Sequence, residues 1–220
     1  MNNMQQITRA GDKIEKSSFE VIDSEIGPHN FTNSEYEIVR RIIHSTADFE
    51  FKDLTVFSRN AVERGIEALK SGCAVITDVK MIQVGLNKNR LDTYGCRTYN
   101  FISDDDVIAA AKKNDTTRAA ESMRRAAELG LLENSIVAVG NTPTSLIELI
   151  KICGEKNIRP ALIIGVPVGF ISAEESKEEL LETDYPYILT RGRKGGSTIA
   201  VAIIHALLAL SVKGAPEEKE

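Results

Sequence analysis

His44 follows Arg40 and Arg41 by four and three residues, in a segment whose apolar residues recur with helical spacing. On a helix, those spacings place the imidazole and both guanidinium groups within reach of one another on one face. Two neighbouring cations would lower the pKa of His44 unless a bound anion or a carboxylate compensates them. An imidazole beside guanidinium groups suits proton transfer on an anionic ligand. A surface histidine with charged neighbours is the competing interpretation, and the spacing alone favours it.

A run of cations and glycines at residues 191–198 leads into a long apolar segment. If a helix begins at Ser197, its free backbone N–H groups and the preceding cations form a site for an anion. The run lacks the Gly-x-x-x-x-Gly-Lys-Ser/Thr spacing of a phosphate loop, so a nucleoside triphosphate is not implied. A flexible turn with solvated charges explains the run equally well.

Two further helix starts are candidates for anion binding. Gly140-Asn141-Thr142 precedes a predicted helix with Pro at its first position, and simple capping is the competing interpretation. Arg118 falls in the first turn of another predicted helix, where the macrodipole favours acids, so this arginine could serve a ligand. The acids at 104–106 resemble a metal cluster less than a helix cap. We therefore predict no metal site.

Short apolar runs alternate with helical patterns along the chain. Strands are expected over residues 73–78, 98–102, 135–139, 161–165 and 188–190. Helices are expected over residues 33–47 (capped by Ser34), 58–70, from 103, 116–129, 143–153, 173–182 and from 197.

This alternation with short turns predicts the α/β class: a mainly parallel sheet with helices on both faces, a Rossmann-like three-layer arrangement. The chain is expected to form a single domain with an N-terminal helical extension. In such sheets ligands bind outside the carboxyl ends of the strands. Those ends fall at residues 77–78, 140–142, 165–167 and 191–193, where a site should be sought.

Composition narrows the functional classes. The 220 residues carry a net charge of −5, so the basic excess of a typical nucleic-acid binder is missing. Three cysteines without a C-x-x-C pair favour a reducing compartment. The longest apolar run, 198–212, is too short to span a bilayer. We expect a soluble, cytoplasmic protein with a core over about residues 11–210 and a disordered tail over 213–220.

Several short motifs occur in a fixed order over nearly the whole chain. They are Ile14-Glu15-x-x-Ser18-Phe19, Arg41-x-x-His44, Asp78-x-x-Met81, Gly140 to Leu146, Val168-Gly169-Phe170, Glu175-Ser176-Lys177 and Arg191 to Ser197. Together they resemble the precorrin-8X methylmutases and their cobalt-dependent counterparts, the cobalt-precorrin-8 methylmutases. Each motif is weak alone, whereas the ordered set is specific.

The resemblance implies a homodimeric isomerase of cobalamin biosynthesis. Such an enzyme moves a methyl group from C11 to C12 of a corrin precursor by a 1,5-sigmatropic shift, giving hydrogenobyrinate or cobyrinate, without an organic cofactor. It also implies that His44 donates or accepts the proton and that Ser18, Arg41 and Arg118 contact the substrate.

From the predicted helix starts we also expect substrate carboxylates to be bound by Asn141, Thr142, Gly195, Gly196 and Ser197.

Two other functions are compatible with parts of the sequence. A non-catalytic tetrapyrrole- or nucleotide-binding module could use the Gly195-Gly196 helix start for anions. A methyltransferase with a bound sulfonium cofactor is disfavoured, because no glycine-rich loop follows the first expected strand. The sequence does not decide whether the corrin substrate is metal-free or contains cobalt.

Overall fold

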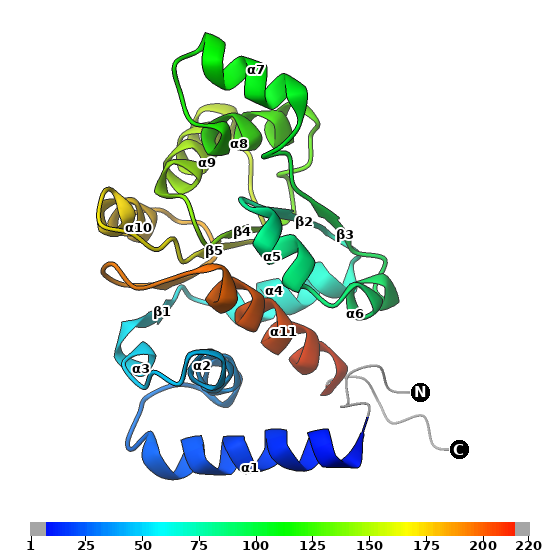
Figure 1. Ribbon diagram of the computed structural model, residues 1–220, viewed down its shortest axis with the longest axis vertical. Coiled ribbons are helices and arrows are strands. Elements are labelled where there is room, and N and C mark those ends of the chain that lie inside the picture. The colour runs from blue at the N-terminus through cyan, green and yellow to red at the C-terminus, as the bar shows by residue number, and fades with distance from the viewer. Residues whose placement is uncertain (1–7, 214–220) are drawn as a thin grey trace.

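In the computed structural model, residues 8–213 form a six-stranded sheet between two layers of helices (Figure 1). The strand order is β1-β6-β5-β4-β2-β3, with β2 to β6 parallel and β1 antiparallel to β6. The strands are β1 (Thr55–Phe57), β2 (Ala74–Thr77), β3 (Arg97–Tyr99), β4 (Ile136–Val139), β5 (Leu162–Gly165) and β6 (Tyr187–Thr190). The predicted α/β class and mainly parallel sheet are therefore confirmed.

The helices include every one that the sequence predicts. They are α1 (Arg9–Glu25), α2 (Asn33–Thr46), α3 (Phe51–Leu54), α4 (Ala61–Lys70), α5 (Lys80–Gly85), α6 (Lys88–Thr93), α7 (Asp105–Lys113), α8 (Arg118–Glu128), α9 (Pro143–Lys156), α10 (Ala173–Leu181) and α11 (Ser197–Lys213). The tail predicted for 213–220 lies, apart from Lys213, outside the described residues. Among the helices of 8–213, none combines the length and apolar composition that a membrane span requires.

Several predicted boundaries are wrong: the strand predicted over 98–102 spans Arg97–Tyr99, and the helix predicted over 143–153 continues to Lys156. Thr32, not Ser34, caps α2: its hydroxyl accepts the Glu35 N–H while the Glu35 carboxylate accepts the Thr32 N–H, a reciprocal capping box. The second predicted helix begins at Ala61 rather than Ser58. The Ser58 hydroxyl instead accepts the N–H of Tyr187 at 2.7 Å, which ties this loop to β6.

Alternate side chains of each central strand enter different cores, as the pleat requires. On β4, Ile136 and Ala138 face the core beneath α2, α4 and α11, whereas Val137 and Val139 face the core beneath α8, α9 and α10. Both faces of the sheet are thus covered by helices (Figure 1). This burial on two sides explains why the strands read as continuous apolar runs rather than as alternating patterns.

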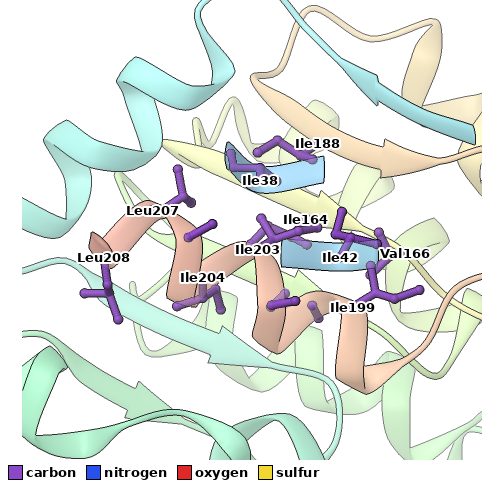
Figure 2. Packing of buried hydrophobic residues seen from close by; sticks show 14 of the residues in the cluster. Ile38, Ile42, Ile164, Val166, Ile188, Ile199, Ile203, Ile204, Leu207 and Leu208 are labelled. Carbon is purple, nitrogen blue, oxygen red and sulfur yellow. The ribbon is translucent and has the colours of Figure 1, made fainter. Parts of the chain in front are cut away.

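Helices α2 and α11 meet above one face of the sheet (Figure 2). Ile38 and Ile42 of α2 and Ile199 and Ile203 of α11 are at most 2% exposed. Full burial of an isoleucine side chain stabilises a fold by about 1.5–3 kcal/mol. The contact fixes the end of α2 against the start of α11, although the two helices are far apart in sequence.

Two of the three histidines make structural contacts. His29 stacks on Tyr36, with ring centroids 4.5 Å apart. His205, in α11, accepts the backbone N–H of Asn87 on its Nε2 at 3.1 Å and so ties α11 to the start of α6. Burial, followed by the nearby charges of Arg90 and Arg41, lowers the pKa of His205 from 6.5 to about 4.

The low pKa of His205 predicts a loss of stability in acid. Between pH 6.5 and about 4 the unfolded chain protonates this imidazole while the folded chain does not, so falling pH favours unfolding, by up to about 3 kcal/mol. His205→Gln keeps an acceptor for the Asn87 N–H without this titration. Urea unfolding at about pH 7 and about pH 5 should show a smaller acid loss for the variant than for the wild type. Equal losses would contradict the assignment.

Candidate active site

Asp78 lies at the point of the sheet where the order of the strands reverses. The neighbours β2 and β4 are followed by β3 on one side and β5 on the other, so the order of the strands reverses there, the place where parallel sheets of this kind bind ligands. The fully buried Asp78 carboxylate accepts the N–H groups of Gly140, Asn141 and Thr142 at 3.1, 2.8 and 2.8 Å. Burial raises the pKa of Asp78 above its usual range, and these hydrogen bonds oppose the shift.

This arrangement changes how Asn141 and Thr142 could meet a ligand. Their backbone N–H groups, the donors that a helix start would offer to an anion, already bind Asp78. Their side chains contact each other, since the Asn141 amide Nδ2 donates to the Thr142 hydroxyl at 3.0 Å. Any contribution of these two residues to substrate binding therefore rests on the side chains.

The loop before α11 packs closely against the carboxyl end of β5. The Gly196 N–H donates to the Val166 carbonyl at 2.8 Å, and Gly196 has a φ of 138°. A Cβ atom on Gly195 would lie 2.3 Å from the Val166 oxygen and 2.6 Å from the Pro167 oxygen. Only glycine permits this close approach of two backbone segments. Gly195, Gly196 and Ser197 are therefore brought to the strand ends where the sequence predicted a site.

His44 lies exposed near the end of α2, against Phe19 of α1. The two ring centroids are 5.0 Å apart. The guanidinium carbons of Arg40 and Arg41 lie 4.5 and 5.4 Å from the centre of the same Phe19 ring. Phe19 thus supports the imidazole and both cations, and Ser18 precedes it on α1.

Carboxylates of the chain itself balance the two arginines. Arg40 binds Asp23 at 3.0 Å and Glu37 at 2.6 Å, and Arg41 binds Glu15 at 3.2 Å. The sequence alone does not identify these partners, and the resemblance suggests carboxylates of the substrate in their place. Here α1 supplies two of the three acids, and the packing of its apolar residues, including the buried Ile22, holds it on α2.

A pocket of about 340 Å³ lies between the end of α2 and the loop before α11. Ser45 and Thr46, the residues directly after His44, line one side, and Gly195 and Gly196 line another. The pocket therefore joins the segment that follows His44 to the anion-receptive loop, and His44 itself does not line it.

Contacts continue from this loop to Arg118. A Cβ atom on Gly140 would lie 3.0 Å from Ser197 Cα, so the end of β4 abuts the start of α11. The hydroxyls of Thr117 and Thr144 are 2.8 Å apart and join the first turns of α8 and α9. Arg118, exposed at the first position of α8, therefore stands at the same edge of the sheet.

Sequence reasoning missed the residues that support this edge. The sequence shows Asp78 as a strand end and a motif residue, but not as the acceptor of three backbone N–H groups. It shows Lys194 as one cation of the run at 191–198, whereas in the structure its Nζ binds Asp48 at 2.5 Å and Glu50 at 2.7 Å, directly after α2. Two acids just past a predicted helix end were the available signal. Among residues 8–213, no group of three or more His, Cys, Asp or Glu side chains could hold a metal ion.

Fold and site together define an α/β protein with anion-receptive groups at the carboxyl edge of its sheet and the exposed His44 near the end of α2. A sequence model described as precorrin-8X methylmutase matches residues 13–210. The cobalt-precorrin-8 methylmutase of Leptospira interrogans is 56% identical over 96% of this chain and 98% of its own length. That of Priestia megaterium is 46% identical over 94% and 91%.

A solved structure agrees with these sequence relatives. The crystal structure of the precorrin-8x methyl mutase from Thermus thermophilus is 44% identical and matches with a TM-score of 0.85, over 91% of this chain and 98% of that one. The chain belongs to the precorrin-8X methylmutase family and is a methylmutase, an isomerase of cobalamin biosynthesis. Family membership thereby decides against the binding module and the methyltransferase.

The close approach at Gly195 yields a direct test. Gly195→Ala places a methyl group against the Val166 and Pro167 carbonyls, so the loop must move, and a shift of about 1 Å can lower methylmutase activity by about 100-fold. Gly154→Ala in α9 is the matched control, because its Cβ meets nothing within 4 Å. We expect that control to keep full activity and to gain roughly 0.5–1 kcal/mol of stability. Full activity of Gly195→Ala would refute the steric argument.

Proposed function

We propose that the enzyme moves the methyl group from C11 to C12 of cobalt-precorrin-8 or precorrin-8X, giving cobyrinate or hydrogenobyrinate. The observation that carries the proposal is the exposed imidazole of His44 near the end of α2, where the next two residues, Ser45 and Thr46, line a pocket together with Gly195 and Gly196. Since the two curated relatives are both named cobalt-precorrin-8 methylmutases, the cobalt-containing pigment is the first candidate substrate. Cobalt would then arrive within the substrate.

His44 would supply the proton that assists the shift. Imidazole is the side chain whose charge changes closest to neutral pH, and protonation of the macrocycle makes the migration terminus poorer in electrons. The carboxylates on Arg40 and Arg41 support this role, because they balance the positive charge beside the imidazole. A general acid of this kind accelerates a reaction by about 10²–10⁴-fold, and holding the ring in its reactive shape supplies the remainder.

The peripheral carboxylates of the substrate would be bound at several separate points. Arg41 and Ser18 flank the histidine, and Arg118 stands at the far end of the strand edge. Between them, the loop Gly195-Gly196-Ser197 and the side chains of Asn141 and Thr142 offer polar groups. A corrin precursor carries many carboxylates around an apolar ring, so scattered sites suit it better than one deep charged pocket.

The proposed role of His44 predicts a loss of turnover with retained binding. His44→Ala should lower turnover by about 10²–10⁴-fold, because the proton donor is absent, while substrate affinity stays within a few-fold. Movement of the methyl group alters ring conjugation, so the visible spectrum reports conversion of either pigment. His29→Ala is the control, since His29 stacks on Tyr36 from the loop between α1 and α2 and should retain turnover. Unchanged turnover in His44→Ala would overturn the role, whereas wild type that converts neither pigment would overturn the proposed function.

We also propose that the enzyme is a cytoplasmic homodimer. The resemblance implies two copies, and the loop between β5 and α10 supports this, because Phe170 and Ile171 are 85% and 84% exposed. Cys73, Cys96 and Cys153 are free thiols, which is compatible with a reducing compartment.

The exposed apolar pair predicts a solution mass twice that of the 24.2-kDa chain. Light scattering on the wild type should give the dimer mass, and Phe170→Asp should shift the equilibrium toward the monomer. Leu129→Asp, which changes a half-exposed leucine just after α8, should leave the mass unaltered. A monomeric wild type would refute the dimer.

A further inference from the structure

Lys177 is fully buried in α10, although lysine is among the residues most rarely found in a protein interior. It belongs to the motif Glu175-Ser176-Lys177, for which the proposed reaction has no use. Its ammonium group donates to the backbone carbonyl of Lys194 at 2.9 Å, a neutral acceptor rather than a carboxylate. Burial lowers the pKa of Lys177 to about 8, and the charge of Glu174 opposes the shift. A buried cation with so weak a partner is costly to the fold.

The Lys194 carbonyl that accepts from Lys177 also accepts a second hydrogen bond. The Thr190 hydroxyl donates to the same Lys194 oxygen at 2.9 Å, from the last residue of β6. On the other side, the Lys194 ammonium binds Asp48 and Glu50 beyond the end of α2. Lys194 therefore links β6 and α10 to the segment that follows His44.

Holding this oxygen also orients a donor at the pocket. The Lys194 carbonyl and the Gly195 N–H belong to one planar peptide group, and in a trans peptide the two bonds point in opposite directions. No cis peptide bond occurs within residues 8–213. A carbonyl directed at the buried Lys177 and Thr190 therefore directs the Gly195 N–H away from them. Lys194 and Gly195 both line the pocket between this loop and the end of α2.

We propose that Lys177 is a positioning residue for the substrate: it fixes the Lys194–Gly195 peptide so that the N–H group of Gly195 is preset for a carboxylate of the corrin precursor. The inference rests on the proposed function, because it deepens the role of the same loop. Lys177 acts through the loop and touches no reacting atom. Its loss therefore weakens binding of the anionic substrate more than it slows the chemical step.

Two variants remove the two donors to the shared carbonyl. Lys177→Met keeps an unbranched buried side chain without the ammonium group, and Thr190→Val keeps the shape of threonine without the hydroxyl. We expect KM to rise about tenfold for Lys177→Met and about threefold for Thr190→Val, with kcat within about threefold of wild type. The dissociation constant of the reaction product, followed by its visible spectrum, should rise in parallel with KM.

A core variant separates positioning from general destabilisation. Leu132 is fully buried before the amino end of β4, at the edge of the sheet opposite the site, so Leu132→Ala should lower thermal stability without altering KM. Wild-type KM and product affinity in folded Lys177→Met would overturn the proposal, as would an equal rise in Leu132→Ala. If Lys177→Met does not fold, Thr190→Val decides alone, and an unchanged KM there overturns the proposal.

The proposed function is tested separately by the wild type. If wild type converts neither pigment, both proposals fall. If wild type is active and the variants match it, only the role of Lys177 falls.

Discussion

A carboxylate in the interior, bonded to three successive amides, holds the two halves of the sheet edge in register. Asp78 ends the β2 side and Gly140, Asn141 and Thr142 begin the α9 side, so one side chain joins segments 62 to 64 residues apart. Without it, the buried Gly140 N–H would lack an acceptor, at a cost of about 1–3 kcal/mol, and the part-buried N–H groups of Asn141 and Thr142 would lose theirs. Gly140, fixed in this way, packs closely against the backbone of Gly196 and Ser197. The anion-receptive loop therefore depends on a residue that itself faces no ligand.

Local features of the fold could be predicted from the sequence. Apolar runs such as 135–139 and 161–165 became β4 and β5, because strands buried on both faces leave a continuous signal. Helices α3, α5 and α6 span only four to six residues, too few to show a 3.6-residue period. Strand β1 has three residues and pairs with β6, more than 130 residues later, so no local pattern announces it.

The same distinction separates the predicted site residues from those that support them. His44, Arg40 and Arg41 lie within one helical turn, and their spacing alone shows that they can interact. The partners of Asp78 and Lys177 are defined only when distant segments meet: Lys177 binds a carbonyl 17 residues away, through a turn whose path no residue pattern specifies. A buried lysine and an exposed lysine look alike in a sequence.

The contact between α2 and α11 has a consequence for how the enzyme is made. The pocket at the end of α2 takes Ser45 and Thr46 from the first quarter of the chain, whereas α11, which completes it, begins at Ser197. During synthesis on the ribosome, the apolar faces of Ile38 and Ile42 stay without their partners Ile199 and Ile203 until nearly the whole chain has emerged. Early helices and the first parallel strands can form before then, but the pocket cannot. Nascent chains that end before α11 would therefore expose the apolar face of α2 and lack the pocket at its end.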